Sequence, residues 1–436
     1  MTQKLYVKTF GCQMNVYDSN RMIAALAVHG FNTTESPEKA DVLLLNTCHI
    51  REKASEKLFS EIGRLAKLKK KSALIVVAGC VVQAEGSEIL HRSPLIDIAV
   101  GPQNYHQLPE LIAKYARAKG RVVMADFPAE SKFDFLPMPQ TSSANAFLAI
   151  QEGCDNFCSY CVVPYTRGCE YSRPSADILQ EAKALVKAGA KEIMLLGQNV
   201  NCWHGDTGRD LGDLIRDMAK IRDLRRIRYT TSYLSKMTQN LIKAHADTPK
   251  LMPYIHLPIQ AGSDKTLRAM NRQYTVAEYE KIVAAFRAVR PDIAISSDFI
   301  VGFPGETEED FEETLHLVER VKYASSYSFK FSARPGTPAS LMKNQIPEDV
   351  KTRRLMKLQK LLQSQQRAFN EATIGKELDV LLTERGKMRG QLVGYTPYMQ
   401  GTVVKAPLKM LGEIVRVKIT GASATALTGK IIGHQE

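Results

Sequence analysis

Three cysteines within eight residues give the sequence its strongest chemical signal. Cys154, Cys158 and Cys161 follow the spacing CxxxCxxC. Three thiolates on one short loop can each bind a different iron of a cubane [4Fe–4S] cluster, and the fourth iron then lacks a protein ligand. That open iron suits the amino and carboxylate groups of S-adenosylmethionine, so the spacing predicts a cluster that binds and cleaves this molecule. The alternative is a structural zinc site whose fourth ligand is Cys169 or a histidine.

Three more cysteines are far apart in sequence but share a position. Cys12, Cys48 and Cys80 each follow the end of a separate predicted strand. The carboxyl ends of parallel strands meet at one edge of a sheet, so we predict that these thiolates converge on a second [4Fe–4S] cluster with one open iron. The alternative is three unrelated buried cysteines. Cys169 and Cys202 belong to neither pattern, and we assign both to packing.

The elements that must position the first group alternate between strand and helix patterns. Near-continuous apolar runs are typical of strands covered on both faces, and helix patterns separate them. This rhythm predicts a parallel α/β sheet in residues 1–135. The predicted strands are Lys4–Phe10, Ala40–Thr47, Ala73–Gly79 and Ile96–Gly101, and the predicted helices are Asn20–His29 and Ser55–Lys69.

A stretch with Pro and Ser, Phe135–Ala146, is predicted to be a linker. Six further βα units follow in roughly 190 residues, which favours a partial (βα)6 barrel over an eight-fold one. Its first strand leads into the CxxxCxxC loop, so the cysteines are expected at the C-terminal mouth of the barrel, within a domain of residues 140–371. The predicted strands are Ala146–Gly153, Glu192–Asn199, Arg226–Tyr233, Tyr254–Gln260, Ile293–Phe303 and Ser326–Ala333; the helices include Asp177–Ala188, Ala277–Val289, Thr307–Val321 with Thr307 as its N-cap, and Glu348–Glu371.

The last segment, residues 373–436, has short alternating runs with glycines between them. This pattern predicts a small antiparallel β-barrel. The segment holds nine Lys and Arg against five Asp and Glu. Basic residues interleaved with aromatic ones can bind phosphates and stack bases, and the alternative is a solvated basic face. The candidates are Lys387, Arg389, Lys405, Lys409, Tyr395 and Tyr398.

Composition narrows the class of protein. The formal net charge of the 436 residues is +13, which attracts polyanions without identifying one. No apolar run is long enough to span a bilayer, and the N-terminus lacks a secretory pattern. We therefore expect a cytoplasmic protein without a membrane partner, and a monomer. In that compartment eight cysteines point to metal binding or catalysis rather than to disulfides.

At this point the residues resemble the methylthiotransferases of the radical S-adenosylmethionine superfamily, along essentially the whole chain. The last block looks like the small RNA-binding barrel, called TRAM, that ends these enzymes. The motifs that carry the resemblance are KTFGCQMN (Lys8–Asn15), NTCHIREKASEK (Asn46–Lys57), AGC (Ala78–Cys80), EGCDNFCSYCVVPYTRG (Glu152–Gly168), LGQNVN (Leu196–Asn201), HLPIQAGSD (His256–Asp264) and DFIVGFPGETEEDF (Asp298–Phe311).

Within this family, NTC followed by IREKA is most similar to the tRNA branch that acts on isopentenyladenosine beside the anticodon. Some residues depart from the pattern of that branch. None of them is a predicted cluster ligand, so the departures concern the contacts with the substrate and not the chemistry. His49 stands at a position that is commonly small, Tyr233 and Leu234 replace a common His-Pro, Ala261 replaces a common Ser, and Cys169 replaces an acidic residue.

The resemblance implies the transfer of a methylthio group to carbon 2 of isopentenyladenosine in the anticodon stem-loop of tRNA. It implies two [4Fe–4S] clusters and two S-adenosylmethionine molecules, one cleaved at the first cluster and one used to methylate sulfur at the second. A reduced electron donor such as flavodoxin or ferredoxin is expected, and the sulfur source is not assigned. By position, the residues expected around the cofactor are Tyr160, Gly197, Ser232, Gln260, Asp298 and Gly302, for which core packing or loop hydrogen bonds are the alternative.

Two other functions compete with this one. A methylthiotransferase of the same chemistry modifies a ribosomal protein or threonylcarbamoyl-adenosine in tRNA. A protein of a different class is a non-catalytic iron–sulfur RNA-binding redox sensor. An open iron at a barrel mouth serves no purpose in such a sensor, which favours the enzyme.

Overall fold

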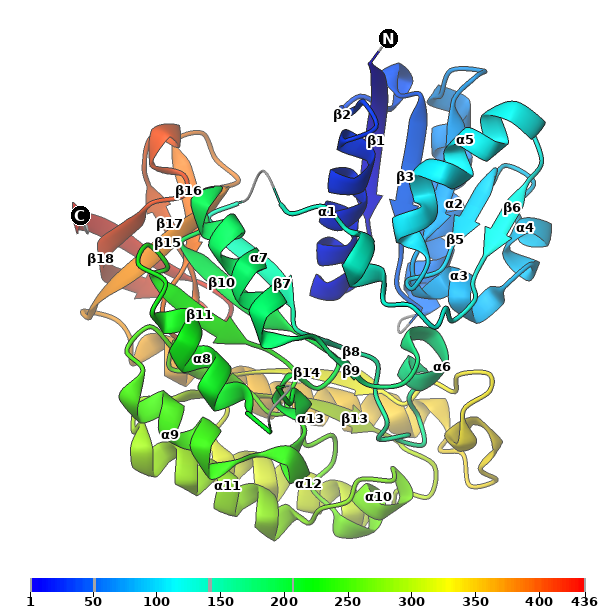
Figure 1. Ribbon diagram of the computed structural model, residues 1–436. Helices are drawn as coiled ribbons and strands as arrows, with labels where there is room; N and C mark the ends of the chain where they lie inside the picture. Colours follow the sequence, from blue (N-terminus) through cyan, green and yellow to red (C-terminus); the bar gives the residue numbers. More distant parts are fainter. Residues whose placement is uncertain (1, 50–51, 140–142, 206–207, 435–436) are drawn as a thin grey trace. The chain divides into compact units, whose positions relative to one another are not determined.

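A computed structural model describes residues 2–49, 52–139, 143–205 and 208–434 (Figure 1). Ile50 and Arg51 of the IREKA motif lie outside these residues. The chain folds into two compact units, and parts of the cysteine loop belong to each. The first unit comprises Met1–Gln140, Glu152–Asp155 and Val162–Tyr171, and the second comprises Thr141–Gln151, Asn156–Cys161 and Ser172–Glu436.

The first unit is built on a six-stranded sheet in the order β2-β1-β3-β4-β5-β6. Every neighbouring pair is parallel. The C-terminal ends of strands β1, β3 and β4 therefore lie next to one another at one edge of the sheet. The elements are β1 (Gln3–Thr9), α1 (Gln13–Ala27), β2 (Phe31–Thr33), β3 (Val42–Asn46), α2 (Glu52–Leu68), β4 (Leu74–Ala78), α3 (Cys80–Glu85), α4 (Glu88–Arg92), β5 (Ile98–Val100), α5 (Leu108–Ala118), β6 (Val122–Met124) and α6 (Val163–Arg167).

Helices cover both faces of this sheet. Val42 and Leu44 of β3 join the core under α1 and α5, whereas Leu43 and Leu45 join the core under α2, α3 and α4. Successive strand side chains point to opposite faces, and here both faces are covered. This is why β3 is apolar throughout except for Asn46 at its end.

The second unit contains six parallel barrel strands in two sheets, β11-β10-β7 and β12-β13-β14. A parallel bridge between Ile227 and Leu251 links them, and one hydrophobic core fills the barrel and packs its helices. Its elements are β7 (Asn145–Ala149), α7 (Ser175–Lys187), β10 (Glu192–Leu196), α8 (Leu211–Ala219), β11 (Arg226–Tyr229), α9 (Gln239–Asp247), β12 (Tyr254–His256), α10 (Asp264–Ala269), α11 (Val276–Val289), β13 (Ala294–Val301), α12 (Glu308–Val321), β14 (Ser325–Lys330) and α13 (Glu348–Glu371). The two-residue strands β8 (Gln151–Glu152) and β9 (Tyr171–Ser172) each have one residue in either unit.

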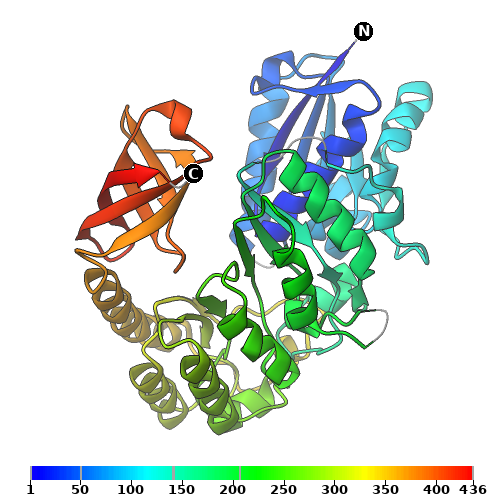
Figure 2. The ribbon, with the colours of Figure 1, turned by 60° about the vertical axis from the view of Figure 1, so that its left-hand side comes forward.

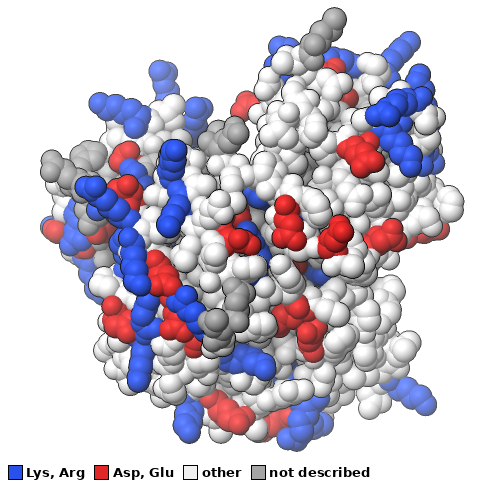
Figure 3. Space-filling view, in the orientation of Figure 1, with Lys and Arg blue, Asp and Glu red and all other residues white. Residues whose placement is uncertain are grey.

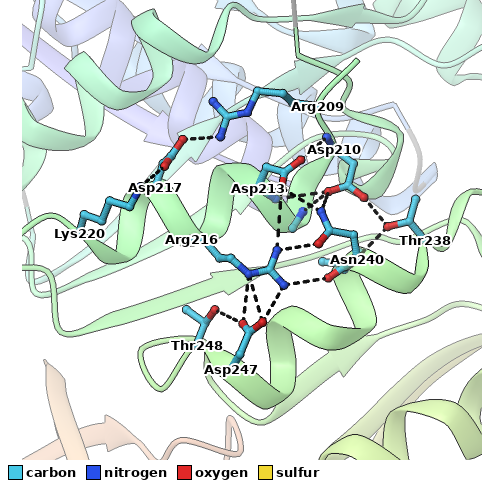
Figure 4. Close-up of polar contacts among 12 residues, drawn as sticks. Arg209, Asp210, Asp213, Arg216, Asp217, Lys220, Thr238, Asn240, Asp247 and Thr248 are labelled. Carbon is cyan, nitrogen blue, oxygen red and sulfur yellow. Dashed lines mark hydrogen bonds and ion pairs between the residues drawn. The ribbon is translucent and has the colours of Figure 1, made fainter. Parts of the chain in front are cut away.

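Polar contacts fix the outer helices α8 and α9 to each other (Figure 4). Asp210 caps α8 by accepting the Gly212 and Asp213 amides, and it also accepts hydrogen bonds from Thr238 and Asn240 at the start of α9. Each such cap satisfies amides that the helix itself leaves unpaired. This cluster lies on the outer helices, and we assign it to stability.

The chain ends in a closed five-stranded barrel that follows α13 (Figure 2). The barrel order is β15-β16-β17-β19-β18. Most pairs are antiparallel, but β17 and β19 are parallel, so the prediction of a purely antiparallel barrel is wrong in that pair. The strands are β15 (Glu377–Arg385), β16 (Gln391–Tyr395), β17 (Gly401–Lys405), β18 (Ile414–Ala422) and β19 (Leu427–His434).

The predicted fold class is confirmed in all three parts: a parallel α/β sheet, a partial (βα)6 barrel and a small closed β-barrel. Several bounds differ. The first helix begins at Gln13 instead of Asn20, and β7 takes the last two residues of the predicted linker. The three-residue strands β2 and β6 were not predicted. The predicted N-cap Thr307 is confirmed, in a capping box with Asp310.

Candidate iron–sulfur sites

Three cysteines follow three neighbouring strands of the first unit. Cys12 follows β1 and occupies the N-cap position of α1, Cys48 lies two residues past β3, and Cys80, two residues past β4, is the first residue of α3. Cys48 and Cys80 are buried, and none of the three forms a disulfide. Residues separated by more than thirty positions in sequence are therefore brought to one sheet edge.

Two glycines make the close approach possible. A Cβ atom on Gly11 would lie 2.4 Å from the Cβ atom of Cys48, and one on Gly79 would lie 2.4 Å from both Asn46 Oδ1 and Thr47 O. Both glycines have positive φ angles, +116° and +100°, and residues that carry a side chain rarely adopt such backbone angles. The loops that carry the cysteines thus need glycine at these positions.

The three thiols form one hydrogen-bonded group with Cys48 in the middle. The hydrogen bond from Cys48 lowers the pKa of Cys12 to about 6 and that of Cys80 to about 7. These two hydrogen bonds raise the pKa of Cys48 well above its usual range, and the bond with Cys12 has the larger effect. Cys48 thus keeps its proton beside two neighbours that favour the thiolate. Thiolates are the form that binds iron, so this donor set fits an iron–sulfur cluster.

A buried amide network supports this group from behind. Asn15 Oδ1 lies 3.1 Å from Cys12 Sγ, and Asn15 Nδ2 donates to Asn46 Oδ1 at 3.0 Å. Asn46 Nδ2 in turn donates to Asn15 O and to Ser19 Oγ. The network ties the loop after β1 to the end of β3. No sequence pattern predicts this network, although Asn15 and Asn46 belong to the motifs KTFGCQMN and NTCHIREKASEK.

A second buried network reaches the same cysteines. Arg167 donates from Nε to Cys80 Sγ at 3.3 Å, and its two terminal nitrogens contact Glu152 at 2.6 Å and Asp18 at 2.7 Å. Lys132 completes the group with a contact of 2.7 Å to Glu152. All four charged side chains are at most 3% exposed. Sequence reasoning missed this network because its members are far apart in the chain.

The CxxxCxxC loop is anchored locally at both ends. The Cys154 amide donates to Gly168 O at 3.1 Å in the first unit, and the Cys161 amide donates to Cys158 O at 2.9 Å in the second. Between the cysteines, Phe157 has a φ of +45°, and its carbonyl accepts from Asn271 Nδ2 at 3.0 Å. The loop presents three cysteines from one continuous segment, as its spacing predicts.

An arginine also stands beside this loop. Arg272 is buried, with Tyr233 and Tyr274 ring centroids 5.1 and 5.5 Å from its guanidinium carbon. Its terminal nitrogens lie 3.1 Å from Pro258 O and 3.8 Å from Cys158 Sγ. Tyr233, one of the departures from the family pattern, therefore packs against a residue next to a cysteine of the loop.

The six candidate cofactor residues all belong to the second unit. Four of them follow the barrel strands: Gly197 after β10, Ser232 after β11, Gln260 after β12 and Gly302 after β13. Asp298 lies within β13, 3.5 Å from His256 Nε2. Tyr160 lies between two cysteines, and burial raises its pKa well above the usual range. The C-terminal ends of barrel strands are where such folds carry chemistry.

Hydrogen bonds within the protein account for part of this set. A Cβ atom on Gly197 would meet Gln151 Oε1 at 2.5 Å, and this oxygen accepts the amides of Gln198 and Asn199. The Gly302 amide donates to Glu306 at 2.6 Å. Ser232 Oγ is buried without a hydrogen-bond partner in the part of the chain that the structure describes, which leaves it available to a ligand.

Two cysteines were not predicted to be cluster ligands. Cys169 is exposed, and Cys202 is half-buried in a short helical turn after β10. Among the described residues, no three His, Cys, Asp or Glu side chains are arranged around a single ion position. A cubane cluster spreads its cysteine ligands over different irons, so such ligands need not surround one ion position.

The C-terminal barrel carries many of the exposed cations of the second unit (Figure 3). Lys387, Arg389, Lys405 and Lys409 are exposed. The two tyrosines are half-buried, and the Tyr398 hydroxyl donates to Asp292 at 2.8 Å. Tyr398 therefore contacts the loop that follows α11, and the basic side chains are the more accessible part of this surface.

The chain matches three family models, in the order of its three folded parts. The model of uncharacterized protein family UPF0004 matches residues 4–101, that of the radical SAM superfamily matches residues 148–318, and that of the TRAM domain matches residues 371–432. Among solved structures, the radical S-adenosylmethionine methyltransferase TsrM from Kitasatospora setae is similar, with a TM-score of 0.59 and 15% identity over 78% of this chain and 74% of that chain. This likeness shows the shared radical SAM fold.

Curated relatives define the family more narrowly. A protein of Maricaulis maris is 54% identical over 99% of this chain and 98% of its own length. A protein of Wolbachia pipientis is 54% identical over 98% of both chains. Both are named tRNA-2-methylthio-N(6)-dimethylallyladenosine synthase, and this chain belongs to that family. No helix in the described ranges is both long and apolar enough to cross a membrane.

Proposed function

We propose that this chain attaches a methylthio group to carbon 2 of N6-dimethylallyladenosine, also called isopentenyladenosine, beside the anticodon of tRNA. The observation that carries the proposal is the presence of two separate cysteine triplets in a chain that is 54% identical, over nearly its whole length, to relatives named for this product. The ribosomal-protein and threonylcarbamoyl-adenosine alternatives have no comparable support.

The cofactors of this radical SAM enzyme are S-adenosylmethionine and [4Fe–4S] clusters. When bound, they supply one-electron chemistry and a transferable sulfur, which side chains lack. In the proposal, Cys154, Cys158 and Cys161 hold one cluster, and Cys12, Cys48 and Cys80 hold the other. The lowered pKa of two thiols in the second group favours the ligating form.

The other residues bind and orient. Tyr160, Gly197, Ser232, Gln260, Asp298 and Gly302 are proposed to surround S-adenosylmethionine at the barrel mouth. Residues 1–135 carry the second cluster, residues 140–371 form the radical SAM core, and residues 373–436 bind RNA through the exposed cations of the C-terminal barrel, since Lys and Arg neutralise phosphates. We further propose a monomer that receives electrons from a flavodoxin or ferredoxin.

The test is a single-turnover assay. The full chain is reconstituted anaerobically with iron and sulfide, then mixed with S-adenosylmethionine, a reductant and an anticodon stem-loop that contains isopentenyladenosine. Mass spectrometry of the nucleosides is expected to find one added methylthio group. Cys154→Ala should abolish both this product and 5′-deoxyadenosine, whereas Cys12→Ala should abolish the RNA product. The matched controls Cys169→Ala and Cys202→Ala should retain both.

Each result separates one part of the proposal from another. Formation of 5′-deoxyadenosine with unmodified RNA would contradict the substrate. Full activity of Cys12→Ala would contradict the second ligand group. Loss of activity in Cys169→Ala would show that the ligand assignment is incomplete.

A further inference from the structure

We infer that Arg167 is a positioning residue of the second cysteine group: its Nε–H bond to Cys80 holds the sulfur of that ligand and stabilises negative charge there. This inference rests on the proposed function, because it takes Cys12, Cys48 and Cys80 as cluster ligands. It adds a residue that lies outside both cysteine triplets.

The guanidinium is held so that its third nitrogen faces the sulfur. Glu152 and Asp18 contact the two terminal nitrogens, at 2.6 and 2.7 Å. Together they fix the plane of the group, and Nε then lies 3.3 Å from Cys80 Sγ. The ion pairs with Glu152 and Asp18 use only the terminal nitrogens, so they do not by themselves account for the contact between Nε and Cys80 Sγ. All three nitrogens of Arg167 are thus directed to separate partners, which a flexible ammonium group cannot match.

The backbone around Arg167 is fixed as well. Arg167 is the last residue of α6, which packs against α3, the helix that begins with Cys80. Gln103 Nε2 donates to Arg167 O at 2.7 Å. The segment that follows the first cysteine loop in sequence therefore supplies a contact to the second cysteine group within the first unit.

The electrostatic effect has a definite sign. Arg167 is 3% exposed, so its charge acts on Cys80 with little screening by water. Hydrogen bonds to cluster sulfurs and nearby positive charge favour the more negative, reduced form, which raises the reduction potential. Arg167→Lys keeps a positive charge near Asp18 and Glu152 but removes the Nε donor.

The test isolates the second cluster in the full-length Cys154→Ala/Cys158→Ala/Cys161→Ala variant, reconstituted with iron and sulfide. Electron paramagnetic resonance follows its reduction at poised potentials. Adding Arg167→Lys is expected to shift the one-electron equilibrium about tenfold towards the oxidised form, which corresponds to a midpoint roughly 59 mV lower. The matched control is Arg173→Lys, because Arg173 is equally buried but pairs with Glu181 and the Ala149 carbonyl. It should leave the midpoint unchanged.

A second measurement leaves Arg167 in place. The same triple variant is labelled with [15N]arginine, and pulsed electron paramagnetic resonance should detect a 15N coupling to the reduced cluster. If the triple variant holds no iron, the proposed ligand group and this inference both fail. If it holds iron but shows neither the 15N coupling nor a midpoint shift distinct from that of Arg173→Lys, only the role of Arg167 is overturned.

Discussion

Gly11 sets how closely Cys48 approaches the loop that carries Cys12. Alanine at this position would place its Cβ 2.4 Å from the Cβ of Cys48, so Gly11→Ala is expected to separate the two thiols. We predict that it lowers iron bound per chain by more than half in the Cys154→Ala/Cys158→Ala/Cys161→Ala variant. Iron analysis and the visible absorption of the reconstituted protein measure this.

Gly30→Ala provides the matched control. Gly30 also has a positive φ, +84°, but no atom lies within 4 Å of its added Cβ. Both substitutions therefore carry a backbone cost of about 1–3 kcal/mol, and only Gly11→Ala disturbs the cysteines. Equal iron content in the two variants would contradict the prediction.

At the residue scale, sequence patterns were enough to predict the convergence of Cys12, Cys48 and Cys80, because each follows a strand of a parallel sheet. They were insufficient for Asp18 and Arg167, which are separated by 149 positions. No local pattern links such a pair, and a buried charge is visible only once the chain has folded around it. The assignment of S-adenosylmethionine contacts rests on position alone and stays a prediction.

The start of helix α12 links a capping motif to acid stability. Burial raises the pKa of Asp310, but hydrogen bonds from Lys265, Thr307 and Ser263 outweigh it and lower the pKa to about 2. A carboxylate whose pKa is lowered by folding stabilises the folded state at pH values above its pKa in the unfolded chain, which is near 3.8. This contribution to stability is lost as the pH falls towards 2. We predict that Asp310→Asn removes this pH dependence of the unfolding free energy.

Chemical denaturation at pH 5, 4 and 3 measures the effect, and Asp310→Asn should also cost about 1 kcal/mol at pH 5 through the weakened cap. Glu278→Gln in the capping box of α11 is the control, because the same motif is there exposed to solvent. A pH profile of Asp310→Asn parallel to that of the unmodified protein would contradict the prediction.

At the element scale, strong apolar periodicity located the long helices and the buried strands. The first helix was predicted to begin seven residues too late because its early residues are polar yet buried: Asn15, Asp18 and Ser19 face the amide and charged networks rather than a hydrophobic core. The strands β2 and β6 have three residues each, too few to show an alternating pattern. The parallel pairing of β17 with β19 depends on barrel closure, which sequence does not show.

At the scale of the whole molecule, a buried cluster of charged residues holds the C-terminal barrel against strands β10 and β11 within the second unit. Arg226 donates to the carbonyls of Tyr395 and Asp379, and Arg228 donates to those of Pro397 and Thr396. Glu192 lies between the two guanidinium groups, 2.9 Å from Arg228 and 3.7 Å from Arg226. Burial lowers the pKa of Arg226 to about 10.

We predict that Glu192→Gln destabilises the protein by about 3–5 kcal/mol, because it leaves buried cations without their counter-charge. Calorimetry should show the C-terminal barrel unfolding at a lower temperature in Glu192→Gln than in the unmodified protein. Glu413→Gln breaks an exposed ion pair with Lys191 at the same contact with the barrel and should cost at most about 1 kcal/mol. Similar losses for both variants would contradict the role of burial.

The two cysteine groups also differ in how the chain must be organised before they exist. Cys154, Cys158 and Cys161 are close enough in sequence to meet in an unfolded chain, where closing so short a loop costs little entropy. Cys12, Cys48 and Cys80 meet only after β1, β3 and β4 have paired. If these groups hold clusters as proposed, the first needs only the short segment 154–161 to bind iron, whereas the second needs β1, β3 and β4 to have paired first, so its cofactor loading depends on folding of the N-terminal sheet.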